Sequence, residues 1–235
     1  MLHQREVNVL TYGFGEADVQ GHQLSFTAHG LTMQVTTPQG DATITANVAG
    51  RFNASNLLAV LATLLCSGIA LPQAVAAISS LQPVAGRMQR LGGGALPLVI
   101  VDYAHTPDAL EKVLTALREQ CKGKLICVFG CGGDRDKGKR PLMAQMVSRL
   151  ADHAIVTADN PRHEDLNNII ADIVQGMSNS YAIEPDRAAA IRAAIQQASA
   201  GDVVLLAGKG HENYQQIGDE KRLFSDLKVA EEALA

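Results

Sequence analysis

The sequence contains no tryptophan, and aromatic residues make up only 4% of its 235 positions. Proteins that bind single-stranded nucleic acids stack the bases on aromatic side chains, so this scarcity argues against that class. Positive charge is not in excess either, because the formal net charge is -4. A surface for DNA or RNA needs clustered basic residues in excess. We therefore expect no nucleic-acid partner.

Long apolar runs are also missing. The longest ones are shorter than the roughly 20 residues that a membrane-spanning helix needs. The N-terminal residues MLHQREVNVL lack the basic region and apolar stretch of a secretory signal. Neither zinc-finger spacing nor a disulfide framework is found among the four cysteines, Cys66, Cys121, Cys127 and Cys131. These features predict a cytoplasmic protein with reduced thiols and no membrane contact.

The first part of the chain has the period of strands and then the period of helices. Residues 31–36 alternate between apolar and polar side chains, and residues 44–48 repeat this pattern after a turn. The run NASNLLAVLATLLCS at residues 53–67 predicts a helix that ends at Gly68. A shorter helix is predicted after Pro72. We therefore expect a β-hairpin followed by helices.

The second part begins near Pro83, where QPVAGRMQRLGGGALP (residues 82–97) is rich in glycine and proline and predicts a linker or a domain boundary. Beyond it, strand-like runs alternate with helical patterns. One helix is predicted to begin at Thr106-Pro107, and another to span residues 164–177 with one apolar stripe. The strand-like runs are LVIVD, KLICVFG, HAIVTAD, SYAIE and DVVLLAG. This alternation predicts an α/β fold with a mainly parallel sheet, covered by helices on both faces.

Polar and charged residues follow four of these strands. Ligands bind at the carboxyl ends of the strands in an open parallel sheet, so we expect the four segments to converge on one polar cleft. The segments are residues 102–105 (DYAH), 130–140 (GCGGDRDKGKR), 159–162 (DNPR) and 208–212 (GKGHE).

The second of these segments nearly matches a phosphate-binding loop. Residues 133–140, GDRDKGKR, fit the pattern G-x-x-x-x-G-K-[ST] except at the last position. Arg140 stands where the motif needs the hydroxyl that holds magnesium, and long charged side chains crowd the loop. The interpretations are a phosphate-binding loop, a basic turn that caps a helix, and an arginine site for carboxylates. The last suits the residues best.

Several polar residues have both a functional and a structural interpretation. Asp102 could be a metal ligand, a ribose acceptor or a partner of a helix start, and its place after a strand favours ligand contact. Asn53 and Asn56 lie one helical turn apart and can point the same way, although Asn53 could simply be a helix N-cap. Arg87, in the predicted linker, could merely be solvated.

Histidines and one cysteine also fall in the candidate loops. His105 and His211 could be bases or metal ligands, but a lone histidine in a loop more often has a structural role. Cys131 lies in a glycine-rich loop, which raises the question of a reactive thiol. No base can be assigned to it, which favours a small packing residue. We assign no catalytic residue and no metal ligand.

These motifs, in this order, resemble the Mur ligases, and among them the members that use meso-diaminopimelate. The resemblance covers nearly the whole chain, more weakly before Gly50, and GCGGDRDKGKRP, DNPR and GKGHE are its most specific parts. The matching stretches are GRFNASNLLAVLATLL, PVAGRMQRL, VDYAHTPDALEKVL, VFGCGGDRDKGKRPLM, TADNPRHED and LLAGKGHENYQ.

The resemblance implies three domains: one for the UDP end of the substrate, a central ATP-binding domain with a P-loop, and a Rossmann-like C-terminal domain that brings the amino acid. By this resemblance, the present sequence is expected to lack the first domain and the P-loop half of the second. Residues 1–84 are then expected to be the β-hairpin and helical tail of the central domain. Residues 85–235 are expected to be the C-terminal domain. Phosphoryl transfer depends on the missing groups, so we expect the chain alone to turn over no ATP.

The implied reaction joins meso-diaminopimelate to the UDP-N-acetylmuramoyl-dipeptide that ends in D-glutamate. ATP phosphorylates the D-glutamate carboxylate, and the amine of the amino acid then displaces phosphate. The resemblance implies ATP and Mg²⁺, bound mainly outside this chain, and a monomeric cytoplasmic enzyme. A stand-alone amino-acid-binding module and a phosphotransferase that uses residues 133–140 are the alternatives.

Position by position, the resemblance also implies two sets of contact residues. The nucleotide contacts are Asn53 or Asn56, together with Arg87 and Asp102. The meso-diaminopimelate contacts are Arg135, Asp159, Asn160, Pro161, Arg162, Gly208 and Glu212, with Pro161 as a stiffener. Arg162 is expected to select diaminopimelate over lysine, and its alternative role is to cap the helix predicted to begin near Glu164. Lys209 and His105 lie within matching motifs without an assigned role.

Overall fold

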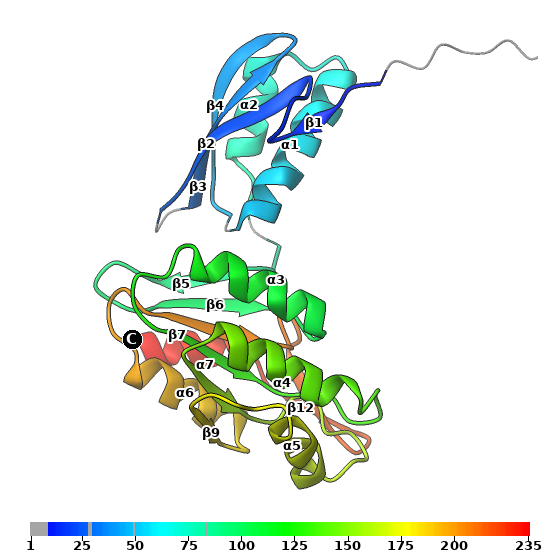
Figure 1. Cartoon of the computed structure of the whole chain (residues 1–235), viewed down its shortest axis with the longest axis vertical. Helices are drawn as coiled ribbons and strands as arrows, with labels where there is room; N and C mark the ends of the chain where they lie inside the picture. Colours follow the sequence, from blue (N-terminus) through cyan, green and yellow to red (C-terminus); the bar gives the residue numbers. More distant parts are fainter. Residues whose placement is uncertain (1–8, 28–29, 49, 83) are drawn as a thin grey trace, which may run out of the picture. The chain divides into compact units, whose positions relative to one another are not determined.

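The computed structural model describes residues 9–27, 30–48, 50–82 and 84–235. The chain divides into two compact units, Met1–Gln82 and Pro83–Ala235. Each unit has its own secondary structure and is described by itself (Figure 1). Within the described residues, no helix is both long and apolar enough to cross a membrane.

The first unit is a four-stranded sheet with two helices. The strands follow each other in chain order, β1 to β4, and neighbours from β2 onward are antiparallel. Their bounds are β1 Tyr12–Gly13, β2 Val19–Thr27, β3 Gly30–Thr37 and β4 Gly40–Ala46. Leu31, Met33 and Val35 of β3 are buried and pack against the helices, as the alternation predicts. The strand β2 had no clear signal of its own in the sequence.

The helices of the first unit are α1 (Arg51–Cys66) and α2 (Leu71–Ser79). The predicted end of α1 is confirmed, because Gly68 adopts the left-handed φ of 81°. The proposed N-cap role of Asn53 is wrong. The helix begins earlier, after Gly50, whose carbonyl accepts a hydrogen bond from the Asn53 amide at 3.0 Å. Asn53 therefore lies inside the first turn.

The second unit contains a six-stranded sheet in the order β5-β6-β10-β7-β8-β9. All neighbouring strands are parallel except the edge strand β5, which is antiparallel to β6. The five predicted strands are confirmed as β6 (Leu98–Asp102), β7 (Leu125–Phe129), β8 (His153–Val156), β9 (Tyr181–Ile183) and β10 (Val203–Ala207). The linker prediction for residues 82–97 is wrong in part, since β5 (Gln89–Gly92) lies inside it.

Helices cover both faces of this sheet (Figure 1). The helices α3 (Pro107–Arg118), α4 (Lys139–Leu150) and α5 (Leu166–Val174) pack in succession on one face. The helices α6 (Arg187–Gln197) and α7 (Asp226–Leu234) share a core with alternate strand residues on the other. Every residue of β7 and β10 is consequently buried, which is the signature of a doubly covered parallel sheet.

Side-chain caps set the beginnings of α3 and α5. The Thr106 hydroxyl accepts the Ala109 amide at 3.3 Å and Pro107 follows in the first turn, which confirms the predicted start of α3. Asp165 accepts the amides of Asn167 and Asn168, so α5 begins two residues later than predicted. A further hairpin, β11 (Tyr214–Ile217) and β12 (Glu220–Leu223), was not predicted.

Candidate functional site

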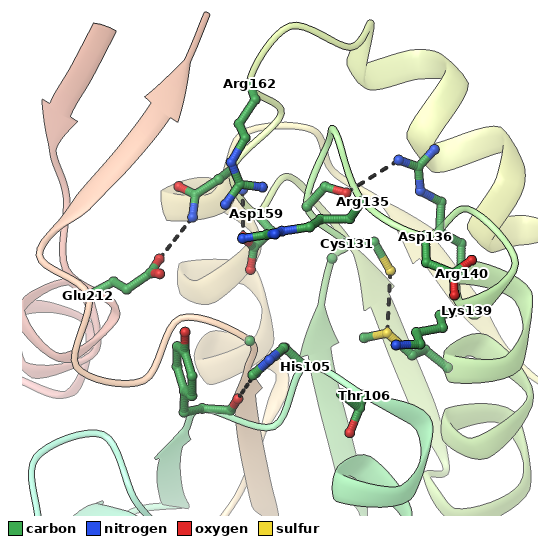
Figure 2. A pocket seen from close by; sticks show the side chains of 16 residues that line it. His105, Thr106, Cys131, Arg135, Asp136, Lys139, Arg140, Asp159, Arg162 and Glu212 are labelled. Carbon is green, nitrogen blue, oxygen red and sulfur yellow. Dashed lines mark hydrogen bonds between the residues drawn. The ribbon is translucent and has the colours of Figure 1, made fainter. Parts of the chain in front are cut away.

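The four polar segments meet at one edge of the sheet of the second unit. Because β10 lies between β6 and β7, and β8 follows β7, the carboxyl ends of these strands lie side by side. A pocket of about 440 Å³ opens there and takes its lining from all four segments (Figure 2). The convergence expected from the strand pattern is thus confirmed. The candidate residues that line the pocket are Arg135, Asp159, Asn160, Arg162, Gly208 and Glu212.

Two arginines bring positive charge to this pocket. The Arg162 Nη1 donates to the carbonyl of Gly133 at 2.7 Å, which holds the guanidinium against the loop after β7. Among the described residues, the exposed Arg135 guanidinium has no hydrogen-bond or ion-pair partner. The alternative role of Arg162 as a helix cap is wrong, because Asp165 caps α5. Both guanidiniums therefore retain donors for a carboxylate.

Two carboxylates bring negative charge to the same pocket. Asp159 is 8% exposed, and its Oδ1 accepts the Asn160 amide at 2.6 Å. Glu212 Oε2 accepts Asn160 Nδ2 at 2.9 Å and Lys209 Nζ at 3.0 Å. Burial alone would raise the pKa of Glu212, but the Asn160 and Lys209 hydrogen bonds and the charges of Lys209 and Arg162 lower the pKa below its ordinary value. Glu212 is therefore an anion suited to an ammonium.

Glycine is required at two positions in the loops that form the pocket. Gly208 has a φ of 111°, and a Cβ there would lie 2.7 Å from Asp159 Oδ2. A Cβ on Gly133 would lie 1.8 Å from the carbonyl oxygen of Pro161. The loops after β7 and β8 are therefore in backbone contact. Pro161 itself is buried and does not line the pocket, consistent with a stiffening role.

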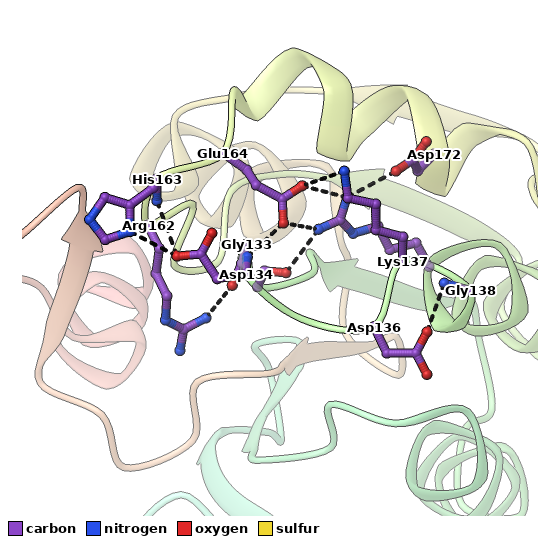
Figure 3. Close-up of polar contacts among 11 residues, drawn as sticks. Gly133, Asp134, Asp136, Lys137, Gly138, Arg162, His163, Glu164 and Asp172 are labelled. Carbon is purple, nitrogen blue, oxygen red and sulfur yellow. Dashed lines mark hydrogen bonds and ion pairs between the residues drawn. The ribbon is translucent and has the colours of Figure 1, made fainter.

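The loop of residues 133–140 is not a phosphate cradle. Protein acceptors already take its backbone amides, at Gly133, Asp134, Gly138, Lys139 and Arg140. Glu164 and Asp172, which are labelled in Figure 3, pair with the buried guanidinium of Arg140. This guanidinium also donates to the Gly132 carbonyl. The phosphate-loop interpretation is therefore wrong, and the arginine side chain that this loop offers a ligand is Arg135.

Arg87 and Asp102 lie in the second unit but outside the lining of the pocket. The Asp102 carboxylate accepts the amides of Met88 and Ala104, both at 2.8 Å. Burial raises its pKa above the ordinary value despite these donors. The exposed Arg87 guanidinium lies 4.9 Å from the centre of the Tyr103 ring. Both side chains remain predicted nucleotide contacts.

Asn53 and Asn56 belong to the first unit. Asn56 Nδ2 donates to Asn53 Oδ1 at 3.3 Å, so the two side chains do point the same way along α1. Their nucleotide contact remains a prediction.

The candidate bases and thiol have mainly structural contacts. His105 lines the pocket, and its Nδ1 lies 2.7 Å from the Tyr103 carbonyl oxygen. His211 packs on the Tyr103 ring. Cys131 contacts Met143 at 3.7 Å, and burial raises the pKa of its thiol to about 12. The packing role of Cys131 is therefore the better one. Within the described residues, no cluster of His, Cys, Asp or Glu side chains could hold a metal ion.

Sequence reasoning assigned no role to the residues that support the pocket from behind. Lys209 is fully buried and bonded to both Asn160 and Glu212, a place that a lysine rarely takes. The hairpin β11–β12 contributes Gln215, which donates to the Asp159 carbonyl, and Gln216, whose amide donates to Asn160 Oδ1. The available signal was the position of Lys209 between two glycines directly after a buried strand. Tyr103, Thr106, Asp136, Lys139 and Met143 also line the pocket without having been singled out.

The second unit is thus an α/β domain whose pocket offers guanidiniums and carboxylates together. Comparison with known sequences specifies the family. Residues 86–210 match the Mur ligase, glutamate ligase domain, and residues 1–64 match the Mur ligase middle domain. The chain belongs to the Mur ligase family.

Individual relatives within the family show which ligases the chain is similar to. The chain is 53% identical over 236 residues to the UDP-N-acetylmuramoyl-L-alanyl-D-glutamate–2,6-diaminopimelate ligase of Chromobacterium violaceum, covering 99% of this chain and 48% of that protein. A solved structure of a ligase with the same name is 40% identical, with a TM-score of 0.74, over 96% of this chain and 47% of that one. The chain therefore spans about half the length of the curated relatives it matches.

A more distant structure shares the fold alone. The MurF ligase of Thermotoga maritima in complex with ADP is 17% identical, with a TM-score of 0.67, over 97% of this chain and 49% of that one. The Rossmann-like, mainly parallel sheet is thus common to ligases of divergent sequence.

Proposed function

We propose that the second unit binds the amino-acid head of meso-diaminopimelate for an ATP-dependent Mur ligase. The observation that carries this proposal is the presence of both charge types in one pocket, with Arg135 and Arg162 facing Asp159 and Glu212 (Figure 2). A free amino-acid head carries a carboxylate beside an ammonium. Arginine pairs with the first and a carboxylate with the second. The name of the Chromobacterium violaceum relative supplies the substrate class.

The distal carboxylate of diaminopimelate gives Arg162 its role. Lysine has an ammonium at that end but no carboxylate, so lysine would leave the Arg162 guanidinium desolvated without a partner. An unpaired charge of this kind is costly. Gly208 and Pro161 shape the wall, and the remaining N–H of Asn160 Nδ2 donates to the ligand carboxylate. The pocket holds one end of the molecule and leaves the other amine free to react.

The whole reaction is amide formation on UDP-N-acetylmuramoyl-L-alanyl-D-glutamate in the cytoplasm. ATP converts the D-glutamate carboxylate into an acyl phosphate, the free amine attacks it, and phosphate leaves. Asn53 or Asn56, Arg87 and Asp102 contact the nucleotide. The described residues offer no cluster of His, Cys, Asp or Glu side chains that could hold Mg²⁺. We place the main ATP and Mg²⁺ sites in other parts of the ligase, as the family resemblance implies. Residues 1–84 correspond to the C-terminal remnant of the central domain, and residues 85–235 to the C-terminal domain.

Calorimetry on the chain and kinetics on a chimera test this function. We expect the chain to bind meso-diaminopimelate at least about tenfold more tightly than L-lysine, a difference of about 1.4 kcal/mol. We expect ATP-dependent ligation when the chain replaces the matching half of the Chromobacterium violaceum relative, and none from the chain alone. Equal affinity for both amino acids would contradict the proposal. Tight binding with an inactive chimera would favour a stand-alone binding module.

A further inference from the structure

Lys209 lies behind the wall of the pocket and not in it. Its side chain is 0% exposed, and it is absent from the residues that line the pocket. Its Nζ donates to Asn160 Oδ1 at 3.0 Å and to Glu212 Oε2 at 3.0 Å. A ligand in the pocket therefore meets Lys209 only through these two neighbours. Both neighbours line the pocket.

The contacts of Lys209 determine which way the side-chain amide of Asn160 faces. An ammonium has only donors, and the second group that reaches Asn160 Oδ1 is the Gln216 amide at 2.9 Å, which is also a donor. The oxygen of Asn160 must therefore face these two groups. Its Nδ2 then faces Glu212 Oε2, to which it donates at 2.9 Å. Without the Lys209 ammonium, one of the two donors that determine this orientation is lost.

The same contacts give the two oxygens of the Glu212 carboxylate different surroundings. Oε2 accepts from both Lys209 and Asn160, whereas Oε1 has no hydrogen-bond partner among the described residues. The side chain of Glu212 is 16% exposed. One oxygen is thus held by the wall and the other is available to the pocket. A buried cation beside Glu212 also keeps the carboxylate charged where burial would favour protonation.

We propose that Lys209 is a positioning residue, which orients the Asn160 amide and directs Glu212 Oε1 toward the ammonium of the bound amino acid. This inference rests on the proposed function. Lys209 does not touch the ligand, so its removal should weaken binding through Glu212 and change how binding depends on pH. The charges that lower the Glu212 pKa are those of Lys209 and Arg162, and the charged side chains of Arg135 and Asp159 line the same pocket. Lys221 from β12 lies farther out, 4.5 Å from the centre of the Tyr214 ring on which Lys209 also packs.

The first test is a double-mutant cycle measured by calorimetry on the 235-residue chain. We expect Lys209→Met to weaken meso-diaminopimelate binding by about tenfold or more, and to have a much smaller effect in the Glu212→Gln background. The matched control is Lys221→Met, which removes an exposed lysine from the same Tyr214 ring and should leave affinity unchanged. An equal effect of Lys209→Met in both backgrounds would overturn the inference.

The second test needs no ligand. We expect the Glu212 carboxylate, followed by carbon-13 NMR, to titrate below its ordinary value of 4.5 in the wild type, and to titrate at a higher pH in Lys209→Met than in the wild type. As the pH falls, binding to the variant should then weaken at a higher pH than binding to the wild type.

If Lys209→Met does not fold, the titration of the wild type still tests the inference. A Glu212 pKa at or above 4.5 in the wild type contradicts the role of Lys209. The outcomes for the two proposals are separable. A low wild-type pKa in a chain that binds no diaminopimelate removes the proposed function and the ligand-directing part of this inference. Normal binding that Lys209→Met leaves unchanged overturns this inference alone.

Discussion

Arg162 is held in a backbone conformation that side chains other than glycine rarely adopt. Its φ is 50°, and such a conformation costs about 1–3 kcal/mol unless the surroundings impose it. The hairpin imposes it here, because the Arg162 amide donates to the Gln216 carbonyl at 3.1 Å and its carbonyl accepts the Gly218 amide at 2.7 Å. The guanidinium is anchored on Gly133 by one nitrogen. The other donors remain for a ligand carboxylate.

Replacement of Arg162 by alanine should reduce the preference for diaminopimelate. We expect kcat/KM for diaminopimelate to fall by well over tenfold in the chimeric ligase, since losing one member of a buried charge pair costs about 2–5 kcal/mol. Lysine use should change far less, because lysine lacks the carboxylate that Arg162 would bind. The measurement is kcat/KM for both amino acids.

A control separates this effect from a general loss of charge. Arg222→Ala removes an exposed arginine of β12 that pairs with Glu220, and should leave both activities unchanged. If Arg162→Ala lowered both activities by the same factor, Arg162 would have only a structural role.

At the scale of elements, ion pairs of the buried Arg140 side chain join the loop after β7 to α5 and the segment before it. Glu164 accepts both terminal nitrogens of Arg140 and the Asp134 amide (Figure 3). Since Arg140 lies in the first turn of α4, the Glu164 carboxylate connects α4, the loop after β7 that carries Arg135, and the segment before α5. The Arg140 hydrogen bonds lower the pKa of Glu164 to about 2, from an ordinary value of 4.5.

This lowered pKa predicts a pH dependence of folding. A carboxylate with a lowered folded-state pKa stabilises the fold fully above the ordinary value, and this stabilisation is lost as the pH falls from about 4.5 toward 2. We expect Glu164→Gln to lower the free energy of unfolding at pH 7, and the difference from wild type to shrink between pH 4.5 and 2. Urea denaturation of the variant and the wild type at several pH values measures this difference in the free energy of unfolding.

The control for this prediction is Glu231→Gln in α7, because Glu231 forms no ion pair among the described residues. The free energy of unfolding of Glu231→Gln should depend on pH as that of the wild type does. A Glu164→Gln difference that stayed constant down to pH 2 would show that the carboxylate acts only as a hydrogen-bond acceptor.

The elements differ in how well their residues reveal them. The apolar runs of β6, β7 and β10 could be predicted because both of their faces are covered. The edge strand β5, with residues QRLG, has one free side and little apolar signal, so it looked like part of a linker. The start of α1 was missed because Gly50 offers no side-chain cap. Lys209 was missed because its burial depends on partners that are 49 and 3 positions away.

The whole second unit depends on one further buried ion pair, which lies beneath the pocket. Arg187 in α6 donates from Nε and Nη2 to the two oxygens of Asp226 in α7, each at 2.7 Å, and both side chains are 0% exposed. The same guanidinium donates to the carbonyls of Ala158 and Ala207. These residues directly precede Asp159 and Gly208. The pair thus connects the last helix to the strand ends that carry the pocket.

Replacement of Asp226 by alanine should destabilise the second unit strongly and leave the first unit unchanged. The change strands the Arg187 charge in the interior, which typically costs about 3–5 kcal/mol. Each unit has its own core, so we expect hydrogen exchange to accelerate in β6, β7 and β10 but not in β3 or β4. The double variant Arg187→Met with Asp226→Leu should recover much of the loss, since apolar residues of similar volume can replace such a pair. A loss below about 1 kcal/mol, or equal acceleration in both units, would show that the pair does not stabilise the second unit in this way.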